Sequence, residues 1–306
     1  MNSNSKIDLD GLRVVNAIVQ EGSFVRAAAL LHRVPSTISY TINKLESGLG
    51  IKIFERDGHR VRLTESGAEL HRYGSELLRM AYETESAIGR LSTGWEAELR
   101  IAVHDFFPED KVMALVREFY EVAQNTRLKI FTEVLTGAWD ALLSGRVDFV
   151  IGIGTDIPEV GGFSTAPAGE VEFVFVVARD HPLAAHPGPL PEDQVRQHRA
   201  VAIADTSRDL PKRSIALLPG QPVLTVSTPA MKIQAHLQGL GVGLVPRHSV
   251  RNYLADGRLV EKNLETGRSW RYPLIYAWKN KHKGRALDWL KARLTDPQRP
   301  VGWFDD

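Results

Sequence analysis

The sequence predicts three parts: an all-α N-terminal winged helix-turn-helix, a long linker helix, and a C-terminal α/β module of two subdomains. Three observations lead to this fold class. Short helical patterns precede a basic pair of strands, one apolar stripe of helical period runs from 64 to 91, and strands alternate with helices from Glu98 onward. A chain of 306 residues is long enough for two or three ordinary domains.

Composition narrows the class of protein. The chain is 43% hydrophobic and 25% charged, as is usual for folded soluble proteins. It has no cysteine, which excludes disulfides, thiolate nucleophiles and thiol redox sensing. The longest apolar run, at 171 to 178, is far shorter than the roughly 20 residues of a membrane-spanning helix, and the polar first residues do not resemble a secretory signal. We therefore expect a cytoplasmic protein without a membrane partner.

Three helices are predicted before residue 50. The first runs from Asp8 to Gln20, the second follows the N-cap residue Ser23, and the third runs from about Pro35 to Gly48. The helical period separates two faces of the third helix. Its apolar face holds Ile38, Ile42, Leu45 and Leu49, and its polar face holds Ser36, Ser39, Tyr40 and Asn43. The polar face lacks the Glu and Lys pattern of an ordinary solvated helix.

A basic wing is predicted after these helices. Residues 50–66 read as two short strands around an Asp-Gly turn, with Ile51, Ile53 and Phe54 facing inward and arginines outward. Between Gly22 and Thr64, seven cations stand against three carboxylates. The resulting net positive charge is modest but favours binding to phosphates.

Helices joined by a short turn and followed by a basic wing predict a helix-turn-helix that enters the DNA major groove. Ser36 and Thr37 suit phosphates or base edges, and Asn43 can pair with adenine through two hydrogen bonds. The predicted DNA-binding residues are Arg26, Arg33, Ser36, Thr37, Ser39, Tyr40, Asn43, Lys44, Arg56 and Arg60. From spacing alone, an ordinary three-helix surface domain remains the alternative.

A long helix is predicted from Thr64 to about Leu91. Its apolar stripe has no domain around it, which favours pairing with a second copy of the chain. The sequence STGW at 92–95 marks a boundary, so the expected domains are 1–63, 64–94 and 95–306.

The C-terminal module is expected to have a largely parallel sheet. We assign 95–169 and 269–306 to subdomain I and 170–268 to subdomain II, with a strand at 171–178 opening the second. The chain would then cross between subdomains near Gly169 and near Arg268. A cleft between two such subdomains is the natural ligand site.

Residues 22–67 resemble the signature of the LysR-type transcriptional regulators. The matching elements are Gly22 to Phe24, Ala27 and Ala28, Ser39 with Ile42, Leu45 with Glu46, Leu49 with Gly50, Phe54 with Arg56, and Leu63, Thr64 and Gly67. This chain departs from the family where it has Pro35 and Tyr40, since glutamine and arginine are frequent on the family's recognition helix. The half-site that it reads is therefore expected to differ from the common one.

The resemblance implies a regulator with a C-terminal module like the type 2 periplasmic binding proteins. Its implied partners are double-stranded promoter DNA, an anionic or aromatic small-molecule effector, and further copies of the chain in a dimer or tetramer; RNA polymerase is left open. The implied effector site lies at strand ends and helix starts. Its residues are His104, Asp105, Phe106, Thr132, Leu135, Thr136, Gly137, Asp205, Thr206, Ser227, Thr228 and Val245. Thr136 and Thr228 could either hold an effector oxygen or serve only as N-caps.

Two other classes of function compete. An enzyme would need a phosphate loop at Gly239, Gly241 and Gly243, but these glycines follow a helix and open a strand, the reverse of a nucleotide-binding motif. A ligand-binding protein, or a DNA-binding factor without regulation, would lack either the recognition helix or the effector module. We therefore expect no catalytic residues, no metal ion and no cofactor.

Overall fold

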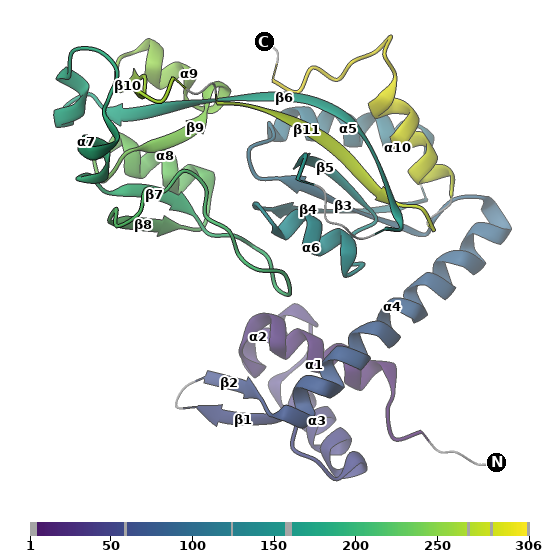
Figure 1. The fold of residues 1–306 in the computed structure, drawn as a ribbon. Helices are drawn as coiled ribbons and strands as arrows, with labels where there is room; N and C mark the ends of the chain where they lie inside the picture. Colours follow the sequence, from purple (N-terminus) through teal and green to yellow (C-terminus); the bar gives the residue numbers. More distant parts are fainter. Residues whose placement is uncertain are drawn as a thin grey trace. The chain divides into compact units, whose positions relative to one another are not determined.

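The structure, a computed structural model, describes residues 5–57, 60–123, 125–156, 161–267, 270–281 and 284–304. The chain divides into two compact units, Met1–Leu91 and Ser92–Asp306, and Figure 1 labels their elements. Within the described ranges, no helix combines the length and apolar character needed to cross a bilayer.

The N-terminal unit packs three helices around a small core: α1 (Leu9–Glu21), α2 (Phe24–Leu30) and α3 (Pro35–Leu49). α1 begins where the Asp8 carboxylate accepts the N–H of Gly11, and α1 and α3 end at glycines in the left-handed conformation. The core is made by Val14, Ile18, Ala27, Ala28, Ile38, Ile42, Leu45 and Ile53. The small side chains of α2 let the other helices approach closely, which confirms the predicted helix-turn-helix.

The wing follows α3. Strands β1 (Phe54–Asp57) and β2 (Arg60–Leu63) pair antiparallel, with Phe54 opposite Leu63. The Asp-Gly turn predicted between them reaches Gly58 and His59, which lie outside the described residues. The long helix α4 (Glu65–Thr93) begins directly after the wing. The hydroxyl of Thr64 joins the two, because it donates to the Lys52 carbonyl (2.6 Å) and accepts the N–H of Gly67 (2.9 Å).

The C-terminal unit is built on a sheet in the order β10-β6-β11-β5-β3-β4. β3 (Glu98–His104) pairs parallel with β4 (Arg127–Glu133) and β5 (Phe149–Gly154), whereas β11 (Arg271–Lys279) pairs antiparallel with β5. The sheet is therefore mixed. The prediction of a largely parallel sheet was wrong. β11 lies between β5 and β6 and runs antiparallel to both, which makes the sheet mixed.

Helices cover both faces of this sheet. Residues at 99, 101 and 103 of β3 pack against α5 (Glu109–Val122) and α10 (Arg285–Thr295), while Ala102 packs on the other side with α6 (Gly137–Leu143). This alternation is the two-residue period of a strand buried on both faces.

A single long strand, β6 (Phe163–Ala178), runs through the unit, as Figure 1 shows. Its first part pairs with β11, and its second part pairs with β9 (Gly243–Pro246) and β10 (Leu259–Lys262). The predicted strand at 171–178 is therefore only the second half of the observed one. Gly169 (φ 101°) lies where the register with β11 shifts, so the glycine marks a bulge and does not end the strand. The second predicted crossing, near Arg268, lies outside the described residues.

The remaining elements complete the unit. They are the 3₁₀ turn η1 (Pro182–Ala185), α7 (Glu192–Arg196), β7 (Ala200–Ile203), β8 (Val223–Val226), α8 (Pro229–Leu237) and α9 (Arg247–Ala255). β7 and β8 form a short parallel pair. A Cβ at Gly241 would lie 2.6 Å from the carbonyl oxygen of Arg199. This glycine thus permits close backbone packing, which accounts for it without a phosphate.

Candidate nucleic-acid interface and ligand cavity

The polar face of α3 is open to solvent. Ser36, Thr37, Ser39, Tyr40, Asn43 and Lys44 are all exposed, and Tyr40 retains 69% of its accessible surface. Within the described part of the chain, the side chains of Ser36, Ser39, Asn43 and Lys44 make no hydrogen bond or ion pair. Since Ile38, Ile42 and Leu45 are buried on the opposite face, the helix presents unsatisfied donors and acceptors outward. A groove of DNA offers the matching base edges and phosphates.

The two predicted arginines that precede α3 already have partners. Arg26 donates to the carbonyl of Glu21, and Arg33 makes two bonds, of 2.9 and 2.7 Å, to the carboxylate of Asp10. The hydrogen bond from Arg33 lowers the pKa of Asp10. Arg33 therefore ties the turn after α2 to α1, and a phosphate would have to compete for its guanidinium.

A buried carboxylate joins α3 to the wing. Glu46 accepts the N–H of Ile53 at 2.8 Å and the ammonium of Lys52 at 2.5 Å. Burial opposes ionisation, but these bonds lower the pKa of Glu46 below its ordinary value. From the sequence, Glu46 is one of the three carboxylates and a position of the LysR signature, and its role in joining α3 to the wing was not predicted. The backbones of Arg56 and Arg60 lie in β1 and β2, and their side chains are outside the described residues.

The C-terminal unit encloses a cavity of about 850 Å³. One wall comes from the ends of β3 and β5 and the start of α6, the other from β7, α8, β9 and α9, and β6 and β11 also contribute. Part of the second wall is the 205–217 segment, the chain that follows β7 and ends before β8. A cavity of this size, with apolar walls and few polar groups, suits a small organic ligand.

Six predicted effector residues line this cavity, and six do not. The lining residues are His104, Asp105, Phe106, Leu135, Thr136 and Val245. The others are Thr132, Gly137, Asp205, Thr206, Ser227 and Thr228. Thr228 accepts the N–H of Met231 at 3.2 Å, so its hydroxyl is the N-cap of α8, and the N-cap alternative describes it.

The N-terminus of α6 is not free for an effector anion. The N–H groups of Thr136 and Gly137 donate to the carboxylate of Asp205, each at 3.2 Å, and those of Ser207 and Arg213 donate to it at 2.8 Å. Burial would raise the pKa of Asp205, but these donors hold it below its ordinary value. Asp205 therefore takes the place that the sequence reasoning gave to an effector.

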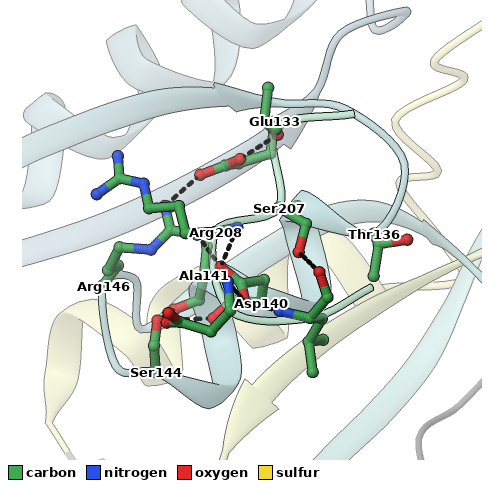
Figure 2. A network of polar contacts seen from close by, with 12 residues as sticks. Glu133, Thr136, Asp140, Ala141, Ser144, Arg146, Ser207 and Arg208 are labelled. Atoms are coloured by element: carbon green, nitrogen blue, oxygen red, sulfur yellow. Dashed lines mark hydrogen bonds and ion pairs between the residues drawn. The ribbon is translucent and has the colours of Figure 1, made fainter. Parts of the chain in front are cut away.

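A second carboxylate anchors the 205–217 segment. Asp140 on α6 accepts the N–H groups of residues 208, 209 and 210 at 3.0 to 3.2 Å, and its other partner is Arg146 at 2.7 Å. Arg146 also reaches Glu133 at 2.6 Å, and Figure 2 shows its guanidinium between the two carboxylates. The segment that forms part of the cavity wall is thus held to α6 by charged hydrogen bonds.

The first wall holds a constrained histidine. The N–H of Leu135 donates to Nε2 of His104 at 3.2 Å, and Nδ1 lies 2.6 Å from a carboxylate oxygen of Asp105. Because Nε2 accepts a bond, the ring proton belongs on Nδ1. Leu135 has a φ of 51°, which is uncommon for a branched side chain. Phe106 stacks against the imidazole with ring centres 4.0 Å apart.

The cavity also contains residues that the sequence analysis missed. Phe173, Tyr272, Lys232 and His248 line it. The Nε2 atom of His248 lies 2.9 Å from the Phe106 carbonyl oxygen, and burial lowers the pKa of His248. The helical pattern around Lys232 was recognised, but an isolated lysine in such a pattern is no signal of a site.

Comparison with known proteins decides the family. Residues 9–68 match the model of the bacterial regulatory helix-turn-helix proteins of the lysR family, and residues 92–297 match the LysR substrate binding domain. The chain belongs to the LysR family of bacterial regulators. The resemblance inferred from residues 22–67 is thereby confirmed, and so is the prediction of a DNA-binding transcription regulator.

Relatives and solved structures agree with this membership. The uncharacterized HTH-type transcriptional regulator YeeY of Escherichia coli K12 is 37% identical, covering 94% of this chain and 92% of the relative. The probable HTH-type transcriptional regulator YhaJ of the same strain is 38% identical, covering 96% and 98%. The full-length structure of the Vibrio cholerae virulence activator AphB is similar in fold, with a TM-score of 0.58, 20% identity and coverage of 92% and 96%.

Three positions of the LysR signature have a structural explanation in this chain. Glu46 bonds the recognition helix to the wing, and Thr64 bonds the wing to the start of α4. Gly67 leaves room for the wing, because a Cβ there would lie 2.1 Å from the carbonyl oxygen of Ile53. These three positions therefore stabilise the N-terminal unit.

Proposed function

We propose that this LysR-family regulator reads DNA with the polar face of α3 and responds to a small molecule held in the cavity of its C-terminal unit. The observation that carries the first part is the set of exposed, unpartnered polar side chains on α3. The second part rests on the 850 Å³ cavity and the carboxylates that anchor its wall. In this proposal the protein acts in the cytoplasm and carries out no catalysis.

Base reading and phosphate contact can be separated by two neighbouring residues. Asn43→Ala should cost about 1–3 kcal/mol at one base position, because Asn43 can make two hydrogen bonds to adenine. Lys44→Ala should weaken binding to all sequences alike and reduce the salt dependence. The measurement is a selection of genomic fragments by the full-length protein at two salt concentrations. An equal loss on every sequence from both variants would contradict the assignment of Asn43 to base reading.

The cavity can be tested by filling it. Gly154 ends β5 and lines the cavity, and a Cβ there has no neighbour within 4 Å. Gly154→Leu should abolish the thermal stabilisation by any small molecule that binds the wild-type protein. Gly161→Leu is the matched control, because Gly161 also has open space around it but lies outside the cavity lining. Ligands that stabilise both variants equally would place the effector elsewhere.

We further propose that α4 pairs with the same helix of a second chain. Tyr73, Leu77, Met80 and Ile88 are large apolar side chains that remain exposed, and they recur at nearly helical spacing along α4. Leu77→Glu should shift the full-length protein towards monomer in sedimentation experiments. Glu76→Gln, on the same turn, should not change the assembly, and equal behaviour of the two variants would contradict this part of the proposal.

A further inference from the structure

Lys232 is a partly buried cation that lines the cavity and has no ion-pair partner among the described residues. It lies on α8 and lines the cavity, and its side chain makes no ion pair or hydrogen bond with any residue that the structure describes. Lysines enclosed by protein normally pair with a carboxylate, because the uncompensated charge is costly. Burial accordingly lowers the pKa of Lys232 to about 8, although the charge of Asp105 partly opposes this effect.

The other ionisable groups in and near the cavity are paired, hydrogen-bonded or held neutral by burial. The Asp105 carboxylate is only 5% exposed and lies 2.6 Å from the His104 ring, and Arg213 pairs with Asp156 at 3.2 Å, with both side chains well exposed. His248 is bonded to the Phe106 carbonyl. His236, one turn beyond Lys232, is buried, and burial lowers its pKa to about 4. Among the described lining residues, Lys232 is therefore the cation whose side chain makes no hydrogen bond or ion pair, and the charge of Asp105 acts on it without such a contact.

The walls around this charge are apolar. Val201, Ile203 and Ile233 surround the α8 side of the cavity, and the aromatic rings of Phe106, Phe173 and Tyr272 line it as well. A doubly charged anion such as phosphate would lose its hydration here with only one ammonium in return. A carboxylate loses less, and an apolar or aromatic body attached to it would fill the rest of the volume.

We propose that Lys232 is the anion-binding residue of the cavity and that the effector is a monocarboxylate with an aromatic body. This inference rests on the proposed role of the cavity as the effector site. The carboxylate would accept a hydrogen bond from the Lys232 ammonium, and the aromatic body would lie against the rings of the opposite wall.

The test uses three probe acids, benzoate, phenylacetate and 1-naphthoate, each paired with its uncharged amide. Binding to the full-length protein is measured by calorimetry at pH 7. We expect at least one acid to bind wild-type protein about tenfold or more tightly than its amide does. Lys232→Met removes the charge at similar length and should abolish this preference, whereas Lys232→Arg should retain it. Lys212→Met is the matched control, because Lys212 is exposed and does not line the cavity.

Two further readouts separate ligand binding from a structural role. Lys232→Met should be at least as heat-stable as the wild type, because it removes an unpaired charge from an apolar site. The affinity for the acid should fall as the pH is raised through about 8, because Lys232 then loses its proton.

The inference is overturned if no probe acid binds, if an acid binds Lys232→Met as tightly as the wild type, or if the amide binds as well as the acid. Gly154→Leu distinguishes this failure from failure of the proposed function. Suppose that a neutral ligand binds the wild type and Lys232→Met but does not bind Gly154→Leu. The cavity would then remain the effector site, and only the proposal of an anionic effector would be refuted. If Gly154→Leu left the binding of an acid unchanged, the proposal that the cavity is the effector site would be refuted.

Discussion

Asp140 offers a sharp test of how the cavity wall is held. Its side chain is 2% exposed, and it accepts three backbone N–H groups of the 205–217 segment together with the Arg146 guanidinium. Asp140→Ala would leave these four donors without their acceptor. Asp140→Asn would keep one carbonyl oxygen but remove the charge.

The magnitude follows from the contacts. Removing one partner of a buried ion pair costs about 3–5 kcal/mol. Arg146 keeps its second carboxylate, Glu133, so the lower end of that range applies, and we expect a loss of about 3 kcal/mol for Asp140→Ala. For Asp140→Asn we expect about half as much, because an amide oxygen can still accept neutral hydrogen bonds.

The assay can isolate the C-terminal unit. All six tryptophans of the chain lie between residues 95 and 303, so tryptophan fluorescence during urea titration follows this unit alone. The midpoint should fall with little change in the slope of the transition. Because the bonds to Arg146 and the backbone hold the pKa of Asp140 below its ordinary value despite burial, the stabilisation is complete above about pH 4 and is lost as the pH falls further.

The control is Asp288→Ala. Asp288 also carries an ion pair, with Lys291 at 2.6 Å, but its side chain is 63% exposed, and exposed pairs contribute at most about 1 kcal/mol. If Asp140→Ala lowered the urea midpoint no more than Asp288→Ala, the claim that this carboxylate anchors the wall would be refuted.

Three more predictions follow from single residues. Glu46→Ala should destabilise the N-terminal unit by about 2 kcal/mol, because it removes the acceptor of the Ile53 N–H; circular dichroism would show an early helical transition, and an unchanged melting curve would contradict this. His236 favours the neutral state, with a pKa of about 4, so wild-type stability should drop by about 3 kcal/mol between pH 6.5 and 4, and His236→Asn should flatten that slope in urea titrations. Gly152→Ala should prevent stable folding of the C-terminal unit, because its Cβ would lie 1.9 Å from the Phe107 ring at a φ of 87°; a variant with wild-type tryptophan fluorescence and urea midpoint would disprove the clash.

Much of the candidate site was predictable where its signal is local. The polar face of α3 follows from the helical period, because residues 36, 39, 40 and 43 must share a side once the helix forms. The positions at His104 and Leu135 came from the resemblance to the LysR family, which implies an effector site at strand ends and helix starts, and both residues line the cavity. Asp205 was predicted to bind the effector, but its carboxylate accepts the N–H groups at the start of α6. The sequence does not distinguish a carboxylate that caps a helix from one that binds a ligand.

The sequence by itself determined the helix-turn-helix, the long helix and the α/β character of the C-terminal unit, because periodicity and capping act over a few residues. Only the tertiary structure decided that β6 is one strand shared by three partners, that Glu46 and Asp140 are buried anchors, and that Lys232 enters the cavity unpaired. Each of these depends on residues far apart in the chain being brought together. Burial and the charges nearby then decide whether an ionisable side chain stabilises the fold or remains free for a ligand.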